Sequence, residues 1–388
     1  MPSRVLCLFL FCIFVLQWTK LYGLSDMRSP HLVNTESNIT EMKAVIDEKI
    51  PYLGNVLSQL GFDVVSLPGA GIAKRDILDA DALFVRTRTL CNRELLGGTP
   101  VKFVGTATIG YDHIDTDFCR EAGIVWSNAP GCNAGAVLQY VQAVLHAWSR
   151  DYGEELAGLT LGIVGVGEIG SRVAAWAESA GMRVLKNDPP REAAGESGFV
   201  SLGRIAAECD VITFHPTLQK GGDWPSYHLA DDAFFESLQR CRLFVNASRG
   251  PVVDNAALLC ALDDKKLPCA VLDVWENEPE LDLGLLNKVY ISTPHIAGYS
   301  AEGKLNATRI VLERFLDFIG YSGERPYLAL PKIEQPVLAK SLPDALLKIY
   351  SPLNDSSRLK NCPGDFESLR NNYDLRREPG AYSIVIEQ

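Results

Sequence analysis

Two series of short apolar runs alternate with helix-like stretches along this chain, and this alternation most constrains what it can fold into. The first series starts after Met42 and ends at Ser127, and the second starts at Leu161 and ends at Ser292. Alternating strands and helices form parallel sheets that helices cover on both faces. We therefore predict an α/β protein with two doubly wound parallel sheets. The predicted strands span residues 44–46, 64–67, 83–86, 103–106 and 124–127, then 161–164, 183–185, 211–214, 243–246, 270–274 and 289–292; the predicted helices span 52–60, 75–78, 115–122, 136–148, 171–180 and 300–319.

The two series divide the chain into predicted domains. We expect residues 42–135 together with 300–320 to form the first domain, and residues 136–299 to form the second. The tail over 321–388 differs, because prolines recur in it before a charged amphipathic stretch over 366–377 and a final apolar run. We predict a small α+β domain there, and its size of roughly 70 residues is near the limit below which one core is insecure. We therefore expect an oligomerisation element that needs a partner surface, and a mobile tail is the alternative.

The residues before Met42 fit neither series. An apolar run over 5–18 is too short for a comfortable membrane-spanning helix. No Ala-x-Ala-like cleavage site follows it, as a secretory signal would require. We interpret residues 1–41 as a leader or a spurious extension outside the fold, with Met42 as the functional start. A membrane-targeting leader is the alternative.

Charge and cysteine usage exclude several classes of protein. The 388 residues carry a formal net charge of −11, which argues against a nucleic-acid surface because such a surface needs a clustered basic face. The ten cysteines form no Cys-x-x-Cys pair and no zinc-type cluster with histidine, so we predict no metal site. Cys241, Cys260 and Cys269 lie in or beside apolar segments, which predicts free and mostly buried thiols. Such thiols indicate a reducing compartment, so we predict a cytoplasmic protein. We also predict no membrane partner.

A glycine-rich turn indicates a dinucleotide site. It reads Gly165-Val166-Gly167-Glu168-Ile169-Gly170, directly after a predicted strand and at the start of a helix. The first glycine allows the tight turn, the second lets the backbone approach a pyrophosphate, and the third lets helix and strand pack closely. The N–H groups at the start of the helix then face the phosphates. Asp188 ends the next strand and can bind the ribose hydroxyls while repelling a 2′-phosphate, so the predicted cofactor is NAD rather than NADP.

Three reactive residues closely follow buried strands of the second series. They are Arg249, Glu278 and His295. The carboxyl ends of parallel strands face one crevice, so we expect these three side chains to meet. A planar guanidinium can hold a carboxylate and the neighbouring oxygen, and a histidine oriented by a carboxylate can take a hydroxyl proton as hydride leaves for nicotinamide. The set therefore predicts oxidation of a 2-hydroxy acid.

Other assignments stay open at these strand ends. Arg249 could instead be a surface or capping arginine, and His295 could be structural. His215 also ends a strand and is the alternative proton-transfer residue, whereas His113 and His146 are expected to be structural. Asp273 either contacts the nicotinamide amide or caps its strand.

Several segments resemble the D-isomer-specific 2-hydroxyacid dehydrogenase family, from about Met42 to the C-terminus. The segments are Phe103-Val104-Gly105-Thr106-Ala107-Thr108, Ala129-Pro130-Gly131-Cys132-Asn133-Ala134, Gly162-Ile163-Val164-Gly165-Val166-Gly167, Asp188-Pro189-Pro190-Arg191, Val271-Leu272-Asp273-Val274-Trp275-Glu276 and Pro294-His295-Ile296-Ala297-Gly298-Tyr299. The tail segments Pro363-Gly364-Asp365-Phe366 and Leu369-Arg370-Asn371-Asn372-Tyr373 resemble one subfamily, because generic members lack this tail.

The resemblance implies a flavodoxin-like substrate domain, a Rossmann NAD domain and a homodimer formed through the C-terminal domain. It implies that Arg249, Glu278 and His295 are catalytic. The NAD contacts that it implies are Asp188, Ala247, Ser248, Asp273 and Gly298, and the substrate contacts are Thr87, Thr108 and Tyr299. On chemical grounds we add Arg86 as a candidate for a substrate phosphate, with a surface ion pair as the equally open alternative.

The subfamily resemblance implies NAD-dependent oxidation of a small phosphorylated 2-hydroxy acid in pyridoxine biosynthesis. Oxidation of another 2-hydroxy acid, such as phosphoglycerate, is the near alternative, and a non-catalytic NAD-sensing protein is the more distant one. The intact Arg/Glu/His set argues against a sensor, which needs no proton relay. The chain reads Phe214-His215-Pro216-Thr217 where the family usually reads Phe-His-Thr-Pro, which puts one hydroxyl contact with NAD in doubt.

Overall fold

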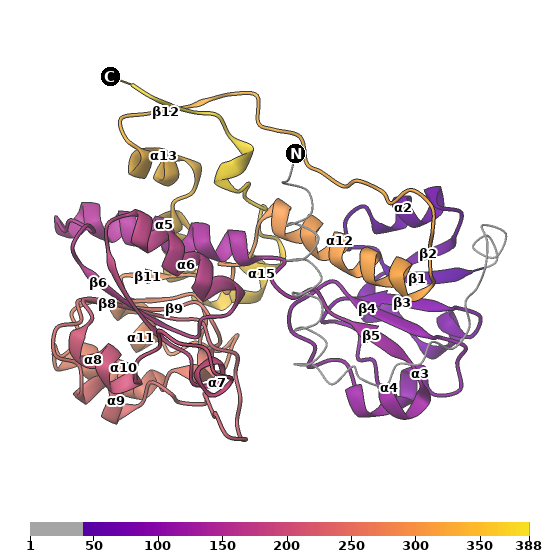
Figure 1. The fold of residues 1–388 in the computed structure, drawn as a ribbon, viewed down its shortest axis with the longest axis horizontal. Coiled ribbons are helices and arrows are strands. Elements are labelled where there is room, and N and C mark those ends of the chain that lie inside the picture. Colours follow the sequence, from indigo (N-terminus) through magenta and orange to yellow (C-terminus); the bar gives the residue numbers. More distant parts are fainter. Residues whose placement is uncertain (1–41, 388) are drawn as a thin grey trace, which may run out of the picture.

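The computed structural model describes residues 42–387, and the predictions for residues 1–41 lie outside this part. Figure 1 shows two α/β lobes side by side, with the C-terminal tail packed on the second lobe. All strand pairs within the two large sheets are parallel. The two predicted sheets are therefore confirmed. Within residues 42–387, no helix combines the length and apolar character needed to cross a membrane.

The first lobe contains a five-stranded sheet with the order β2-β1-β3-β4-β5. Its strands are β1 (Lys43–Asp47), β2 (Asp63–Leu67), β3 (Ala82–Val85), β4 (Phe103–Thr106) and β5 (Val125–Ser127), and its helices are α2 (Leu53–Gln59), η2 (Gly69–Gly71), η3 (Lys74–Ile77), α3 (Arg93–Leu96) and α4 (Thr116–Ala122). This order is the flavodoxin-like one. The long helix α12 (Ala301–Phe318) returns from the end of the second lobe to cover one face, where Phe315 packs edge-on against Phe84 at 5.2 Å between ring centroids.

The second lobe contains a six-stranded sheet with the order β11-β10-β9-β8-β6-β7. Its strands are β6 (Thr160–Val164), β7 (Arg183–Asn187), β8 (Val211–Phe214), β9 (Leu243–Asn246), β10 (Ala270–Leu272) and β11 (Ile291–Ser292), and its helices are α5 (Ala134–Tyr152), α6 (Glu168–Ser179), α7 (Pro189–Ala193), α8 (Leu202–Glu208), α9 (Asp232–Glu236), η4 (Gly250–Val252), α10 (Asn255–Asp263) and α11 (Leu283–Lys288). A parallel bridge between Lys186 and Phe199 extends the sheet beyond β7. The chain reverses its direction of progression between β6 and β8, which is where a Rossmann sheet binds its dinucleotide.

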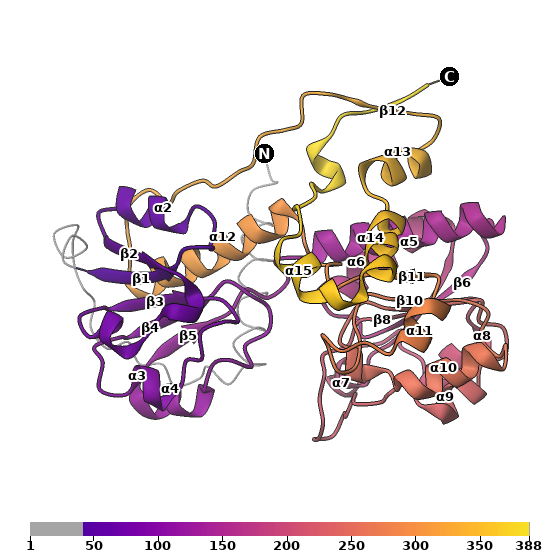
Figure 2. The same ribbon diagram turned by 180° about the vertical axis from the view of Figure 1, so that it is seen from behind.

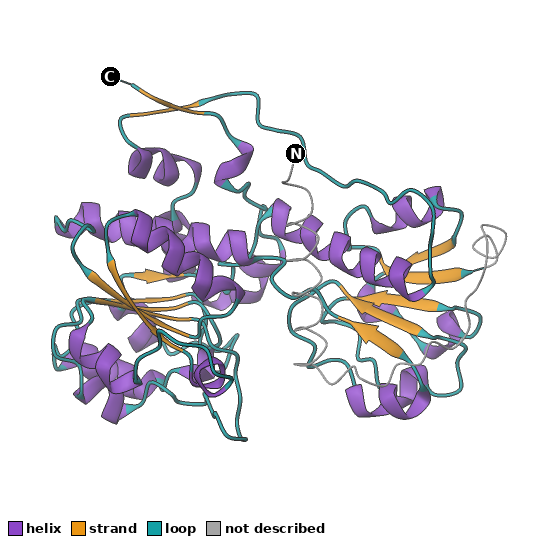
Figure 3. Ribbon diagram, viewed as in Figure 1, coloured by secondary structure: helices purple, strands orange, loops and turns teal. Residues whose placement is uncertain are grey.

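The tail packs on the second lobe and adds a small sheet of its own. Figure 3 shows its two strands apart from both large sheets. Its elements are β12 (Val337–Ala339), α13 (Leu342–Ile349), α14 (Pro352–Asn361), η5 (Pro363–Asp365), α15 (Phe366–Asn371), η6 (Pro379–Ala381) and β13 (Ile384–Ile386). Leu359 and Phe366 are buried in the same apolar cluster as strands β8 to β10, and Tyr350 is buried in the cluster around α5. The structure therefore favours a packed tail over a mobile one. Seen from behind in Figure 2, α15 lies on the side of the second lobe that faces the first.

Some local predictions differ from the structure. The predicted helix over 75–78 is the 3-10 turn η3, and the amphipathic stretch over 366–377 is helical only as far as Asn371. Cys241 and Cys269 are free and buried, as predicted, but Cys260 is exposed. The prediction for Cys260 was wrong because helix α10 buries one face only, and this position lies on the other.

Candidate active site

The His295 side chain lies in the turn after β11 and contacts Glu278. The distance from His295 Nδ1 to Glu278 Oε2 is 2.8 Å, and the two side chains are 25% and 18% exposed. An ionised carboxylate only accepts hydrogen bonds, so Nδ1 is assigned as the donor and Nε2 is left to exchange a proton. The predicted meeting of these two residues is confirmed, and its geometry is that of an oriented acid–base pair.

Glu278 is held in its ionised form by its surroundings. The backbone N–H of Trp275 donates to Oε1 at 2.9 Å. Burial opposes ionisation, but the hydrogen bond and charge of His295, the Trp275 N–H and the charge of Arg370 together hold the pKa of Glu278 below its ordinary value. The carboxylate therefore stays negative at neutral pH.

The buried Asp273 carboxylate fixes the backbone of the His295 turn. One oxygen accepts from the Thr293 hydroxyl at 2.6 Å and from the Ile296 N–H at 2.8 Å, and the other accepts from the Ala297 N–H at 2.9 Å. Burial raises the pKa of Asp273. His295 itself has a φ of 57°, a left-handed conformation that costs a non-glycine residue about 1–3 kcal/mol and persists only where the surroundings impose it. These contacts support the capping alternative for Asp273, and its contact with nicotinamide stays a prediction.

Arg249 follows β9 and reaches toward the first lobe. Its Nη1 donates to the Ser248 carbonyl at 2.8 Å, and a Cβ added at Gly110, in the loop after β4, would lie 3.6 Å from its Nη2. A Cβ at Gly250 would lie 1.8 Å from the Trp275 carbonyl, so only glycine lets this turn pack against the segment that carries Glu278. The structure thus places the Arg249 guanidinium between the lobes. The turn that carries it packs against Trp275, whose backbone N–H binds Glu278.

The glycine turn before α6 forms a cradle that only glycine permits. Gly165 has a φ of 83°, and an added Cβ would lie 2.4 Å from the Pro216 nitrogen. A Cβ at Gly170 would lie 2.1 Å from the Gly165 carbonyl, whereas a Cβ at Gly167 would meet no described residue within 4 Å apart from its neighbours in the chain. No side chain caps α6, so the N–H groups of its first turn face this open space.

Asp188 lies beside the glycine turn and hydrogen-bonds to its backbone. Its carboxylate accepts from the Val166 N–H at 2.7 Å and from the Arg191 N–H at 3.2 Å, which fixes it beside the glycine turn. Glu168 and Ile169 form the first turn of α6, and Glu168 lies against Gly131 in the loop before α5. The turn, the open helix N-terminus and the adjacent carboxylate fit the diphosphate and ribose of NAD.

The predicted substrate contacts come from both lobes. Thr108 Oγ1 donates to the Gly110 carbonyl at 2.8 Å, in the loop beneath Arg249, and Thr87 is exposed just after β3. Arg86 Nε is 2.9 Å from Oδ2 of the buried Asp47, so the structure shows the ion pair that was its alternative role. Tyr299 lies beneath Lys304, whose Nζ is 4.5 Å from the ring centroid.

The remaining predicted cofactor contacts lie in the turns after β9 and β11. Ala247 and Ser248 form the turn after β9, where Asn246 Oδ1 accepts from the Ser248 N–H at 3.1 Å and from its hydroxyl at 2.8 Å. Gly298 follows the His295 turn, and an added Cβ there would lie 2.1 Å from Asn133 Nδ2. Glycine at 298 therefore allows the His295 turn to pack against the start of α5.

His215, the alternative proton-transfer residue, has a different environment. Its Nε2 is 3.0 Å from the Thr213 hydroxyl, and its buried Nδ1 has no hydrogen-bond partner among the described residues. Burial lowers its pKa to about 3. No described carboxylate pairs with it, so the structure favours His295.

Sequence reasoning missed the residues of the tail that support this site. Arg376 is buried, and its Nη1 donates to the Ile296 carbonyl at 2.9 Å while Nη2 donates to the Ala297 carbonyl. Arg370 Nη1 lies 3.9 Å from Glu278 Oε2. Local pattern carries no signal for either contact, since both depend on how a distant segment folds back. The resemblance did include Arg370, but without a role.

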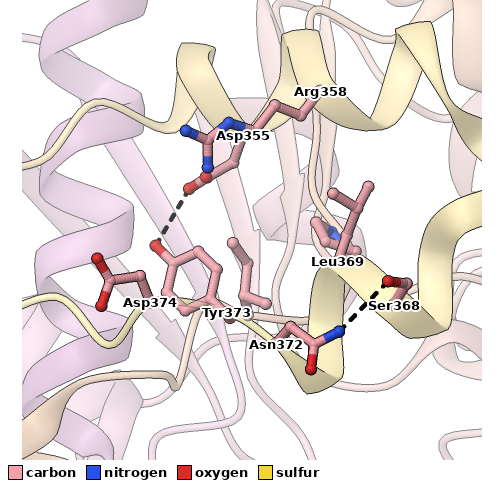
Figure 4. Close-up of a pocket in the computed structure, with 9 residues that line it drawn as sticks. Asp355, Arg358, Ser368, Leu369, Asn372, Tyr373 and Asp374 are labelled. Carbon is pink, nitrogen blue, oxygen red and sulfur yellow. Dashed lines mark hydrogen bonds between the residues drawn. The ribbon is translucent and has the colours of Figure 1, made fainter.

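A cavity of about 220 Å³ lies between the tail and the strand end that carries His295. Figure 4 shows Tyr373 directed toward Asp355, with 3.2 Å between the hydroxyl and Oδ2. Pro294 and Ile296, on either side of His295, contribute to its wall, but none of the predicted site residues does. The cavity is therefore a feature of the tail interface rather than of the candidate active site.

Comparisons with known proteins agree with this architecture. A family model described as the D-isomer specific 2-hydroxyacid dehydrogenase, NAD binding domain, matches residues 136–297. The erythronate-4-phosphate dehydrogenase of Bacteroides thetaiotaomicron is 50% identical over 89% of this chain and 99% of its own length, and that of Proteus mirabilis is 43% identical over 89% and 95%. A glyoxylate reductase structure from Paecilomyes thermophila is 27% identical with a TM-score of 0.58, covering 72% of this chain and 96% of that one.

These matches cover both lobes and the tail, and they define first a class and then a branch of it. The chain belongs to the D-isomer specific 2-hydroxyacid dehydrogenases and, within them, to the erythronate-4-phosphate dehydrogenase family. It is an NAD-dependent dehydrogenase.

Proposed function

We propose that this protein oxidises 4-phospho-D-erythronate to (R)-3-hydroxy-2-oxo-4-phosphooxybutanoate with NAD, as a step in pyridoxal 5′-phosphate biosynthesis. The observation that carries the chemistry is the 2.8 Å contact between His295 and Glu278, at the strand ends of a sheet whose glycine turn fits NAD. The substrate is supported by identities of 42–51% to relatives named erythronate-4-phosphate dehydrogenase.

We assign the catalytic roles to Arg249, Glu278 and His295. The Arg249 fork holds the substrate carboxylate and the oxygen on the neighbouring carbon. His295 Nε2 takes the proton of the 2-hydroxyl group, a step worth about 10²–10⁴ in rate. Glu278 orients the ring and stabilises its positive charge after the transfer. Bound NAD supplies the hydride acceptor.

The binding roles follow the placement of the remaining side chains. We assign NAD to the cradle over 165–170, Asp188 and the turns at Ala247, Ser248, Asp273 and Gly298, and substrate to Arg86, Thr87, Thr108 and Tyr299. We propose residues 42–135 with 300–320 as the substrate domain, 136–299 as the NAD domain and 321–388 as a dimerisation domain, in a homodimer. A cytoplasmic location is proposed on the free thiols of the fold.

A substrate panel tests this function against its alternatives. Purified protein is incubated with NAD and with 4-phospho-D-erythronate, 3-phosphoglycerate or D-lactate, and NADH formation is followed by absorbance. We expect the highest kcat/KM with 4-phospho-D-erythronate. A preference for either other acid would move the protein to a different substrate. NAD binding without turnover of any of the three would favour a sensor.

A further inference from the structure

Three cationic side chains from separate segments converge beside the acid–base pair. Arg86 directly follows β3, Lys304 lies in the first turn of α12, and Arg370 lies in α15 of the tail. Lys304 Nζ lies over the Tyr299 ring at 4.5 Å from its centroid, and the Tyr299 side chain is close enough to Arg370 to raise the pKa of that guanidinium. Tyr299 thus connects the first-turn lysine of α12 to the arginine of the tail.

This cationic cluster is continuous with the catalytic residues. Arg370 Nη1 is 3.9 Å from Glu278 Oε2, the oxygen that also binds His295 at 2.8 Å. In addition, Arg88 Nη2 in the loop after β3 is 3.2 Å from Glu367 Oε2 in α15. The first lobe and the tail therefore meet at α15, the helix that carries Arg370.

Lys304 is the cation without a carboxylate partner in this cluster. Arg86 pairs with Asp47, and Arg370 approaches Glu278, but Lys304 forms no ion pair with any residue over 42–387. Its burial and the positive charges of Arg86 and Arg370 lower the pKa of Lys304, while the Cys132 thiol opposes this shift. Holding a partly buried ammonium next to two guanidiniums is unfavourable, and a bound anion would relieve that repulsion.

We propose that Lys304 and Arg370, on either side of Tyr299, form the binding subsite for the phosphate group of the substrate, with Arg86 at its edge. This subsite rests on the proposed function, because it assumes that the substrate of the His295 site is phosphorylated. Arg249 then holds the carboxylate end of the substrate while the cationic cluster holds the other end. Charged hydrogen bonds to phosphate fix both ends and place the 2-hydroxyl group at His295. The tail contributes specificity through Arg370.

The test uses inorganic phosphate as the probe, together with the Lys304→Met and Arg370→Met variants. In the unaltered enzyme, phosphate should inhibit competitively against the hydroxy acid that the panel identifies. In both variants we expect the inhibition constant for phosphate and the KM for a phosphorylated substrate to rise at least about tenfold, as for a lost charged hydrogen bond. Lys304→Arg keeps the charge and should retain most of the phosphate effect. Arg120→Met, which removes an exposed ion pair with Asp117 on α4, is the matched control.

The outcomes separate the subsite from the function. If 4-phospho-D-erythronate is not oxidised but phosphate still competes through Lys304 and Arg370, the substrate assignment fails and the subsite stands. If 4-phospho-D-erythronate is oxidised but phosphate does not compete, or the variants respond to phosphate as the Arg120→Met control does, the subsite is overturned. A variant that fails to fold is replaced by Lys304→Gln or Arg370→Gln. A phosphate-induced rise in Tm of the unaltered protein, lost in the variants, gives a readout without turnover.

Discussion

Two histidines follow parallel strands of the same sheet, and their surroundings give them different chemistry. His215 follows β8 and His295 follows β11, and each has a proline beside it. His295 contacts the Glu278 carboxylate at 2.8 Å, whereas the one hydrogen bond of the His215 ring to a residue within 42–387 is that to the Thr213 hydroxyl, at 3.0 Å. Burial lowers the pKa of His215 to about 3, so its ring is neutral at neutral pH.

Charged groups fix the turn at His295, and none of the described ones does so at His215. Asp273 binds the N–H groups of Ile296 and Ala297, and Arg376 binds the carbonyls of the same two residues. The turn is therefore held by a buried anion on one side and a buried cation on the other. Position at a strand end thus does not distinguish the two histidines, whereas the carboxylate partner and the fixed backbone turn do.

The strongest test of this contrast removes the imidazole itself. In His295→Asn we expect turnover to fall by at least about 10²-fold, because a lost acid/base costs this much or more. NAD binding, measured by protein fluorescence, should change little, since the ring contacts Glu278 rather than the glycine cradle. Unchanged turnover would remove His295 from the reaction.

Glu278→Gln sharpens the contrast by removing the charge while keeping the shape. We expect kcat to fall about 10–10³-fold, because the imidazolium formed in the reaction loses its counter-charge. The pKa of Glu278 is lowered in the folded protein, so its contribution to the free energy of unfolding is complete above its ordinary value of 4.5 and is lost as pH falls through the lower folded value. Urea unfolding of both proteins at pH 7 and pH 3.5 checks this, and an equal stability difference at both pH values would contradict it.

Arg376→Lys tests whether the tail positions the His295 turn. A lysine keeps the charge but cannot bind all the carbonyls that the guanidinium fork binds. We expect kcat to fall about tenfold with little change in KM, because a small displacement of a catalytic group slows the reaction more than it weakens binding. Arg377→Lys, next to it and paired with Glu302, is the control. A lower Tm with an unchanged kcat would show that Arg376 serves only stability.

His215→Gln should have the smallest effect on turnover. Its amide can still bond to the Thr213 hydroxyl, so we expect a loss well below the ~10² of a missing acid/base. Because burial lowers the folded pKa of His215 from 6.5 to about 3, protonation favours the unfolded chain, and stability falls as pH decreases from 6.5 toward 3. The variant should lose less stability than the unaltered protein between pH 7 and pH 4 in urea titrations. A catalytic defect as large as that of His295→Asn would break the comparison.

The strands were predictable because they are buried on both faces. Parallel strands covered by helices read as continuous apolar runs, and β4, β8 and β9 have the predicted bounds. The glycine cradle was predictable for a similar reason, since the contacts of Gly165 and Gly170 leave no room for a side chain. The short helix α3 was missed because four residues give too little periodicity to recognise.

The contacts of the tail and the choice of ion pairs were not predictable. Arg86 was an even choice between a phosphate and a surface ion pair, and only the fold shows it paired with Asp47. Nothing around Arg370, Arg376 or Lys304 in the chain distinguishes them from surface cations, yet the fold places them around Tyr299 and the His295 turn.

Periodicity and glycine placement can be read from residues close together in the chain, and parallel strands always end at one edge of their sheet. These three rules therefore establish the two sheets, the cofactor turn and the meeting of His295 with Glu278 from the sequence. Which histidine pairs with a carboxylate, and which cations support it, depends on burial and on partners far along the chain. Electrostatic effects of that kind change with each ångström of separation and each layer of covering atoms. The tertiary structure therefore decides these effects, because only there does the tail contact the strand ends.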